Sequence, residues 1–190
     1  DTTANTTGLF SYFNDSQASY IRGDNASTIT FPLPGNVSNA YTLFYRARYN
    51  PESSSSINRR IFSNGPLNAC GAGKEWYSGF DGGKTGLALH GNAITPITGI
   101  DPDDPDTFIV VTDQYDLYRQ DSQDLTTPSP SGVRGSLCQL GVNWATTPVT
   151  ISAFDISDVF IYDRELNFDE ISTVERFLLQ WENPTSQPTG

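Results

Sequence analysis

The sequence is poor in basic residues, in methionine and in long apolar runs. Eleven Lys and Arg stand against 22 Asp and Glu in 190 residues, so the formal net charge is −11 at pH 7. Such a chain repels phosphate backbones, which excludes nucleic-acid partners. No run approaches the roughly 18 apolar residues of a membrane-spanning helix, so no membrane span is expected. Methionine is absent even at position 1, which indicates a processed chain whose leader has been removed.

Core-forming residues are nevertheless abundant. Hydrophobic residues make up 36% of the chain and aromatic residues 12%, with 11 Phe and 9 Tyr, which excludes a disordered protein. The length fits one domain, because cores rarely split below roughly 250 residues. Charged residues reach only 17%, below the roughly 25% of a typical soluble domain. Serine, threonine and asparagine take their place, so the surface should be rich in hydroxyl and amide groups.

Short segments with alternating polarity dominate the chain. In 41–49, Tyr45 and Ala47 fall on one face of an extended strand, and Arg46 and Arg48 fall on the other. Further strands are expected at 9–13, 27–31, 60–63, 76–80, 85–89, 108–112, 116–120, 137–143, 150–154 and 159–162. The pattern predicts an all-β protein, an antiparallel sandwich of two sheets.

One helix is expected, close to the C-terminus. Asn167 can cap it, and Glu170 lies three residues further on, as in a capping box. The apolar stripe that follows consists of Ile171, Val174, Leu178 and Trp181. The helix should therefore dock on a sheet. We expect three regions: an N-terminal arm or first strand (1–13), the sandwich domain (14–181) and a Pro-containing tail (182–190).

Several segments together resemble a known module. Residues 41–49, 60–63, 76–80, 86–90 and 112–119 look like successive pieces of a LamG-like jelly-roll domain of the concanavalin A-like lectin/glucanase superfamily. The segment DVFIYDREL at 158–166, with the helix after it, is the most specific part of a likeness that covers roughly 39–179. The resemblance implies a jelly-roll sandwich, often with one bound calcium, of a variety similar to secreted or surface proteins of microbial eukaryotes.

Four N-glycosylation sequons cluster in the first 38 residues, at Asn5, Asn14, Asn25 and Asn36. Such clustering points to a secreted or cell-surface, extracellular glycoprotein. The alternative is that a polar N-terminal segment produces these tripeptides through its composition alone.

The two cysteines, Cys70 and Cys138, are too few for a zinc site unless His90 and a carboxylate complete it. We expect a disulfide between them, which would stabilise the fold by about 4 kcal/mol by closing a long loop. Two buried free thiols are the alternative.

An acidic loop is the candidate for a metal site. Its carboxylates are those of Asp101, Asp103, Asp104 and Asp106. Hard oxygen ligands of this kind suit Ca²⁺, although a solvated acidic turn is the alternative reading. No cofactor is required by any motif in the sequence.

Catalytic patterns are missing from the sequence. Glucanases of the superfamily carry two carboxylates about 5.5 Å apart on one strand face, but none of the six glutamates alternates with another acidic residue on a central strand. The single histidine, His90, is read as the end of a strand, and no serine has a nucleophile-elbow pattern. The chain is therefore not expected to be an enzyme, and a glycoside hydrolase or lyase is only a remote alternative.

Two functions remain. The first is a structural or interaction protein that self-associates in an extracellular fibre, coat or appendage, with its N-terminal arm added as a strand to a neighbouring copy. The second is a carbohydrate-binding, lectin-like module, for which glycans are the partners. Sugar recognition needs aromatic rings beside polar groups, and Trp76, Tyr77 and Trp144 are the candidates.

Overall fold

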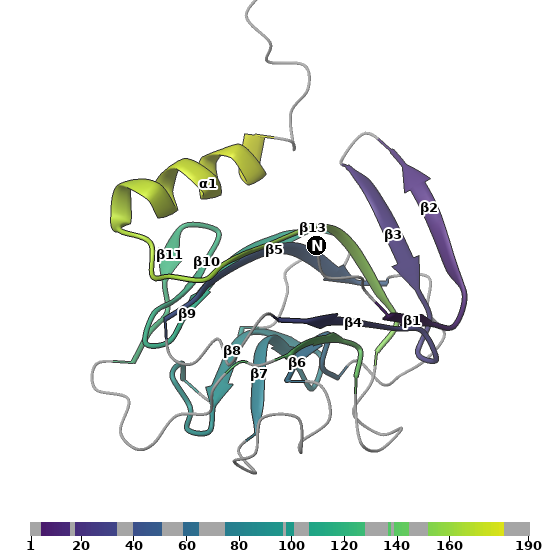
Figure 1. The fold of residues 1–190 in the computed structure, drawn as a ribbon, viewed down its shortest axis with the longest axis horizontal. Helices are drawn as coiled ribbons and strands as arrows, with labels where there is room; N and C mark the ends of the chain where they lie inside the picture. Colours follow the sequence, from purple (N-terminus) through teal and green to yellow (C-terminus); the bar gives the residue numbers. More distant parts are fainter. Residues whose placement is uncertain are drawn as a thin grey trace, which may run out of the picture.

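The computed structural model describes residues 5–15, 18–33, 40–50, 59–64, 75–96, 98–100, 107–127, 137, 139–144 and 152–180. Two antiparallel sheets pack face to face, with one helix on the outside (Figure 1). The predicted β-sandwich is thus confirmed. The six-stranded sheet has the order β1 (Asn5–Thr7), β4 (Thr28–Pro32), β12 (Gln139–Val142), β6 (Phe62–Ser63), β7 (Trp76–Asp81) and β8 (Lys84–His90).

The seven-stranded sheet forms the other layer. Its order is β11 (Gln123–Asp124), β10 (Tyr118–Gln120), β9 (Ile109–Gln114), β5 (Thr42–Tyr49), β13 (Phe154–Tyr162), β3 (Ser19–Gly23) and β2 (Phe10–Asn14). In β5 the predicted alternation is confirmed. Tyr45 and Ala47 lie in the core between the sheets, and Phe44 packs on the opposite face in a cluster with the helix.

The helix α1 (Phe168–Gln180) lies over the outer face of the seven-stranded sheet (Figure 1). Its capping box is confirmed, because Asn167 Oδ1 accepts hydrogen bonds from the backbone N–H groups of Asp169 and Glu170 at 3.0 and 3.1 Å. Glu170 in turn accepts one from the backbone N–H of Asn167 at 2.9 Å. The buried side chains of Ile171 and Leu178 then pack against the outer face of the sheet. No helix in the described ranges is long and apolar enough to cross a membrane.

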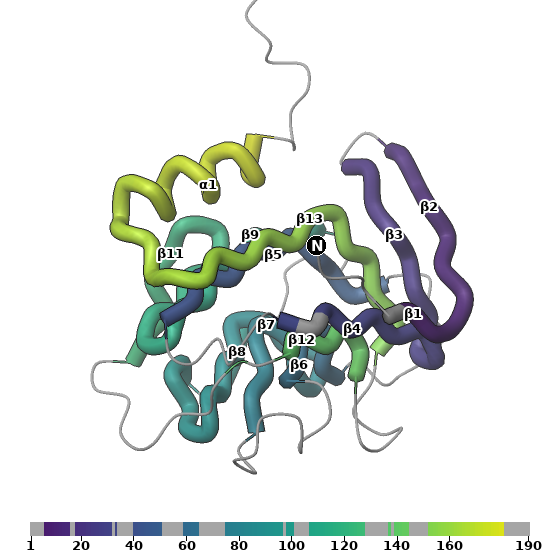
Figure 2. The backbone as a smooth tube through the Cα atoms, viewed as in Figure 1, coloured from purple at the N-terminus to yellow at the C-terminus, as the bar shows by residue number. Residues whose placement is uncertain are grey.

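The segment 1–13 was expected as an N-terminal arm or first strand, and its described part contributes strands to the sandwich. β1 pairs with β4, and β2 pairs with β3 in the other sheet, so the chain crosses between the sheets at one edge of the molecule (Figure 2). The strand β3 was not predicted. Ser27 fixes the crossing point, since its hydroxyl donates a hydrogen bond to the carbonyl of Leu9 at 2.6 Å.

Three buried tyrosines should make the protein less stable at high pH. Burial raises the pKa values of Tyr45 and Tyr118 well above 10, and that of Tyr49 is also raised mainly by burial. The unfolded chain would lose these protons near pH 10, while the folded chain keeps them. Stability is therefore fully present below about pH 10 and falls as the pH rises towards the folded pKa values, by about 1.4 kcal/mol per pH unit for each such phenol.

Urea unfolding at pH 8, 9, 10 and 11 measures this effect. We expect the same free energy of unfolding at pH 8 and 9 and a steep decrease above pH 10. Tyr45→Phe should reduce the slope, whereas Tyr12→Phe at an exposed position should leave it unchanged. Equal stabilities at pH 8 and 11 would contradict the prediction.

Candidate functional site: a groove between β4 and β13

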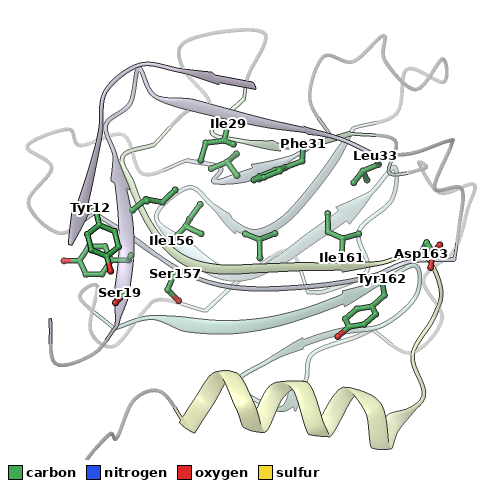
Figure 3. A pocket seen from close by; sticks show the side chains of 14 residues that line it. Tyr12, Ser19, Ile29, Phe31, Leu33, Ile156, Ser157, Ile161, Tyr162 and Asp163 are labelled. Carbon is green, nitrogen blue, oxygen red and sulfur yellow. The ribbon is translucent and has the colours of Figure 1, made fainter. Parts of the chain in front are cut away.

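A groove of about 830 Å³ opens where the two sheets separate, between β4 and the second half of β13. Its described lining consists of Tyr12, Ser19, Tyr20, Ile21, Ile29, Phe31, Leu33, Val142, Ile156, Ser157, Val159, Ile161, Tyr162 and Asp163. Figure 3 shows Phe31 on one wall and Ile161 on the facing wall. The volume lies within the roughly 300–1,000 Å³ of small-molecule sites.

A β-bulge shapes the wall that β13 provides. The register of β13 against β5 shifts between Ile156 and Asp158, so Ser157 is an extra residue without a cross-strand partner in β5. Bulges bend a strand and re-aim its side chains. After this one, Val159 and Ile161 face the core and the groove, whereas a regular alternation from Ile156 would have turned both to the outer face.

The same bulge marks the place where the sheet splits. β3 pairs with β13 only opposite residues 154–156. Within the described part of the chain, no strand pairs with residues 157–162 on the side away from β5. The hairpin of β2 and β3 stands away from β13 beyond this point (Figure 1), and the groove occupies the opening.

An exposed tyrosine ring and small polar groups surround the mouth. Tyr12 is 70% exposed at one end of the groove, beside Ser19 of β3. The carboxylate of Asp163 lies at the other end (Figure 3). Tyr162 lines this end as well, but its ring lies on the helix side of β13, where it packs edge-on against Phe44 with centroids 5.9 Å apart. The mouth thus combines the flat ring of Tyr12 with hydroxyl and carboxylate groups.

Tyr20 remains a neutral phenol at the edge of this site. Its pKa is raised above the usual 10, first by desolvation and then by the negative charge of Asp155. The ring stacks on Phe13 with centroids 5.3 Å apart, so it is rigid. The phenol of Tyr20 is therefore uncharged at neutral pH.

The predicted sugar platform at Trp76 is corrected by the structure. Trp76 is only 1% exposed. Its ring stacks on His90 with centroids 5.3 Å apart, and its Nε1–H donates to the hydroxyl of Tyr41 at 3.0 Å. The residue lies on the core-facing side of β7, so its ring is not available to a sugar.

A role of Tyr77 and Trp144 in sugar binding remains a prediction. Tyr77 is half-buried, and the Arg60 guanidinium carbon lies 4.2 Å from the centroid of its ring, so one ring face is covered. Burial and the charge of Asp81 raise the pKa of Tyr77. Trp144 is half-buried, and its carbonyl accepts a hydrogen bond from the Ser63 hydroxyl at 2.8 Å. Neither residue lines the groove.

The remaining sequence candidates are scattered. Asn14 is exposed at the end of β2, and Asn25 is exposed in the turn between β3 and β4. The backbone of Asn5 lies in β1. Four sets of predicted residues lie outside the described ranges: Asn36, Cys70, Cys138, and the aspartates Asp101, Asp103, Asp104 and Asp106. Within the ranges that are described, no cluster of three or more His, Cys, Asp or Glu side chains is arranged to hold a metal ion.

A buried polar cluster contains the only histidine. His90 Nε2 lies 3.0 Å from Asp113 Oδ1, and His90 Nδ1 lies 3.2 Å from the carbonyl oxygen of Tyr115. Tyr41 donates a hydrogen bond to Asp113 Oδ1 at 3.2 Å. Both His90 and Asp113 have side chains with 0% exposure. A His–Asp pair resembles part of a hydrolase triad, but these groups are closed off from any substrate and link the two sheets.

The groove residues were not found from the sequence. Tyr12 and Tyr162 were assigned to predicted strands without a binding role, and Ser157 fell between two predicted strands. A weak signal exists in the order of residues 154–162, FDISDVFIY, where the apolar alternation slips by one residue at Ser157 and Asp158. Such a slip is typical of a bulge, and bulges are common beside binding sites.

Fold and groove together define an antiparallel β-sandwich with an elongated site at an open edge. Neither a family model nor a curated protein sequence matches the chain. Solved structures of similar fold do exist. One is domain 4 of AbnA, an extracellular arabinanase from Geobacillus stearothermophilus, solved with arabinotriose: TM-score 0.55, 14% identity, 90% of this chain and 87% of that one covered.

Two further neighbours are parts of larger proteins. The binding domain of paraclostridial mosquitocidal protein 1 has a TM-score of 0.60 at 12% identity and covers 92% of this chain and 47% of that one. The sialidase of Trypanosoma rangeli has a TM-score of 0.58 at 12% identity, and the match covers 92% of this chain and 29% of the sialidase. The chain thus spans less than half of the toxin domain and under a third of the sialidase. These likenesses are compatible with a concanavalin A-like fold.

Proposed function

We propose that the protein is a non-catalytic carbohydrate-binding module, lectin-like in function, and that the groove between β4 and β13 is its binding site. The observation that carries the proposal is the mouth of the groove, where the exposed ring of Tyr12 is accompanied by hydroxyl groups and a carboxylate. Sugars present C–H faces that pack on aromatic rings, and hydroxyls that need nearby polar partners.

The shape of the groove suits an oligosaccharide rather than a single compact ligand. Tyr12 and Asp163 lie at opposite ends (Figure 3), with Ser157 between them on β13. A chain of sugar units could stack on the Tyr12 ring while its hydroxyls meet Ser19, Ser157 and Asp163. This arrangement is concave and rigid, as most small-ligand sites are.

The structural neighbours support the same class of ligand. The arabinanase domain is described in complex with arabinotriose, and a botulinum neurotoxin DC binding domain in complex with SialylT. The latter has a TM-score of 0.50 at 10% identity, so the likeness by itself is one of fold. Since the neighbours include toxin binding domains and an extracellular arabinanase, an extracellular location is part of the proposal.

Binding without hydrolysis follows from the acidic groups. Glycoside hydrolases use two carboxyl groups about 5–9.5 Å apart across the scissile bond. Among the described lining residues of the groove, Asp163 is the one carboxylate. The groove could therefore hold a glycan without supplying both the acid and the base.

Self-assembly into a fibre, coat or appendage remains a prediction. β1 and β2 pair within their own chain, so strand exchange with a neighbouring copy would first have to break these pairs. The groove needs no such rearrangement to accept a glycan, which is why we favour carbohydrate binding.

Substitution of Tyr12 tests the proposal. Tyr12→Ala should weaken the binding of a glycan identified on an array by about fivefold, because stacking of an aromatic ring contributes about 1 kcal/mol. Tyr12 is mostly exposed, so the change should leave the thermal midpoint nearly unchanged. Titration calorimetry measures the affinity.

Leu9→Ala is the matched control, because Leu9 is 83% exposed near the same edge and does not line the groove. It should bind as the unmodified protein does. Equal affinity of the two variants, or binding of no glycan by the parent protein, would refute the proposed site.

A further inference from the structure

The charge of the groove restricts which glycans it can accept. Its described lining contains one carboxylate, that of Asp163, and no Lys, Arg or His. The whole chain carries a net charge of −11 at pH 7. A glycan that carries its own carboxylate would lose hydration in the groove without meeting a positive partner, and burying an unpaired charge is costly.

The two arginines next to lining residues in the sequence are held elsewhere. Arg22 follows Ile21, but its guanidinium lies on the other face of β3, where Nε and Nη2 donate to Asp155 at 2.7 and 2.9 Å. Arg164 follows Asp163, but both of its terminal nitrogens donate to Glu170, at 3.0 and 2.7 Å. Each guanidinium is thus already bound to a carboxylate.

The interior of the groove is apolar in contrast to its mouth. Side chains of β4 and β13 form it, among them Ile29, Phe31, Val159 and Ile161. A sugar with hydroxyls on every carbon could cover this surface only with the C–H faces of its ring. A methyl group, whether on a deoxy sugar or in an acetamido substituent, would fill it and remove apolar area from water, worth about 25 cal/mol per Å².

From these two features we infer that the groove selects neutral glycans that carry a methyl or acetamido group, and that it rejects sialylated and other acidic glycans. The inference rests on the proposed function and deepens it. It also separates this chain from a neighbour of the same fold that was solved with SialylT, because recognition follows the residues of a site and not the fold.

Pairs of glycans that differ only by a terminal sialic acid test the charge rule. We expect the neutral member, bearing an N-acetylhexosamine or a 6-deoxyhexose, to bind at least tenfold more tightly than its sialylated partner. The gap should narrow at high salt, because part of the repulsion is screened. A third glycan built from unsubstituted hexoses should also bind more weakly than the neutral, methyl-bearing one.

Two variants test the residues. Asp163→Asn should improve binding of the sialylated glycan by about threefold, the size of one screened repulsion near 7 Å, whereas Asp116→Asn, with the same charge change at an exposed turn, should not. Ser19→Arg would place a cation at the mouth and should admit the sialylated glycan. Gln180→Arg, at the exposed end of α1, is its control.

The outcomes separate the inference from the function on which it rests. Equal or tighter binding of sialylated glycans by the unmodified protein overturns the selectivity but leaves carbohydrate binding intact. If neither member of any pair binds, the proposed function fails with it. If an extended apolar peptide binds in the groove in place of every glycan, the site is a strand acceptor and both are wrong.

Discussion

Replacement of Asp155 with alanine should lower the free energy of unfolding by about 3–5 kcal/mol. The Asp155 side chain has 0% exposure and accepts hydrogen bonds from Arg22 Nε at 2.7 Å and from Arg48 Nε at 2.8 Å. Without the carboxylate, two guanidinium groups remain largely buried and lose their anion. The loss is a large part of the roughly 5–15 kcal/mol that stabilises a typical domain. Urea unfolding measures it.

The size of the effect reflects the position of the three residues. Asp155 is the cross-strand neighbour of Arg22 in β3 and of Arg48 in β5, so one carboxylate ties three adjacent strands together. The Arg48 guanidinium carbon also lies 4.4 Å from the centroid of the Phe108 ring. Asp116→Ala, at an exposed position, should change stability by less than about 0.5 kcal/mol.

A triple variant separates the charge from the packing. Arg22→Met, Arg48→Met and Asp155→Leu combined replace the buried ions with apolar groups of similar size, which is often neutral or stabilising. We expect it to recover most of the stability lost in Asp155→Ala. If the free energy of unfolding of Asp155→Ala lies within about 1 kcal/mol of that of the parent protein, the two arginines are solvated in solution and the prediction is wrong.

The sequence predicted the parts of the fold that local pattern determines. The alternation in β5 was read correctly because Tyr45 and Arg46 differ in polarity and lie on opposite faces. The capping box at Asn167 was also correct, since all of its hydrogen bonds join residues within three positions. Such signals need no information about distant segments.

Long-range contacts determine the parts that were missed. β13 was predicted as two strands because its alternation slips at Ser157, and pairing with β5 on both sides of the bulge makes it one strand. β3 was missed because an arginine such as Arg22 normally indicates an exposed segment. Here the Arg22 side chain is bound by Asp155, 133 residues further along the chain. The groove depends on both features, because it opens where the bulged strand and β3 separate.

The open edge gives the site its combination of rigidity and access. One wall belongs to β13, which is paired on both sides of its bulge with the buried strand β5. The other wall belongs to β4, which is paired with β1 and β12 on its two sides. Most ligand contacts are thus placed on strands rather than on loops. Binding of a glycan would then order little additional chain and would cost little conformational entropy.

Trp76→Ala provides the second large effect, on stability and not on recognition. The indole stacks on His90, and its N–H donates to the hydroxyl of Tyr41 at 3.0 Å. Truncation of a buried tryptophan costs about 3–5 kcal/mol. We expect a loss of this size in urea unfolding, together with a rearranged hydrogen-bond network around Asp113, which accepts from Tyr41.

The affinity for a glycan should behave differently. Measured at low temperature, where the variant is still folded, it should equal that of the parent protein, because Trp76 does not line the groove. Tyr77→Ala is the matched control, since Tyr77 is the next residue in β7 and points to the opposite face; its effect on stability should be smaller. If folded Trp76→Ala protein loses glycan binding while Tyr12→Ala retains it, the site lies near β7 and not between β4 and β13.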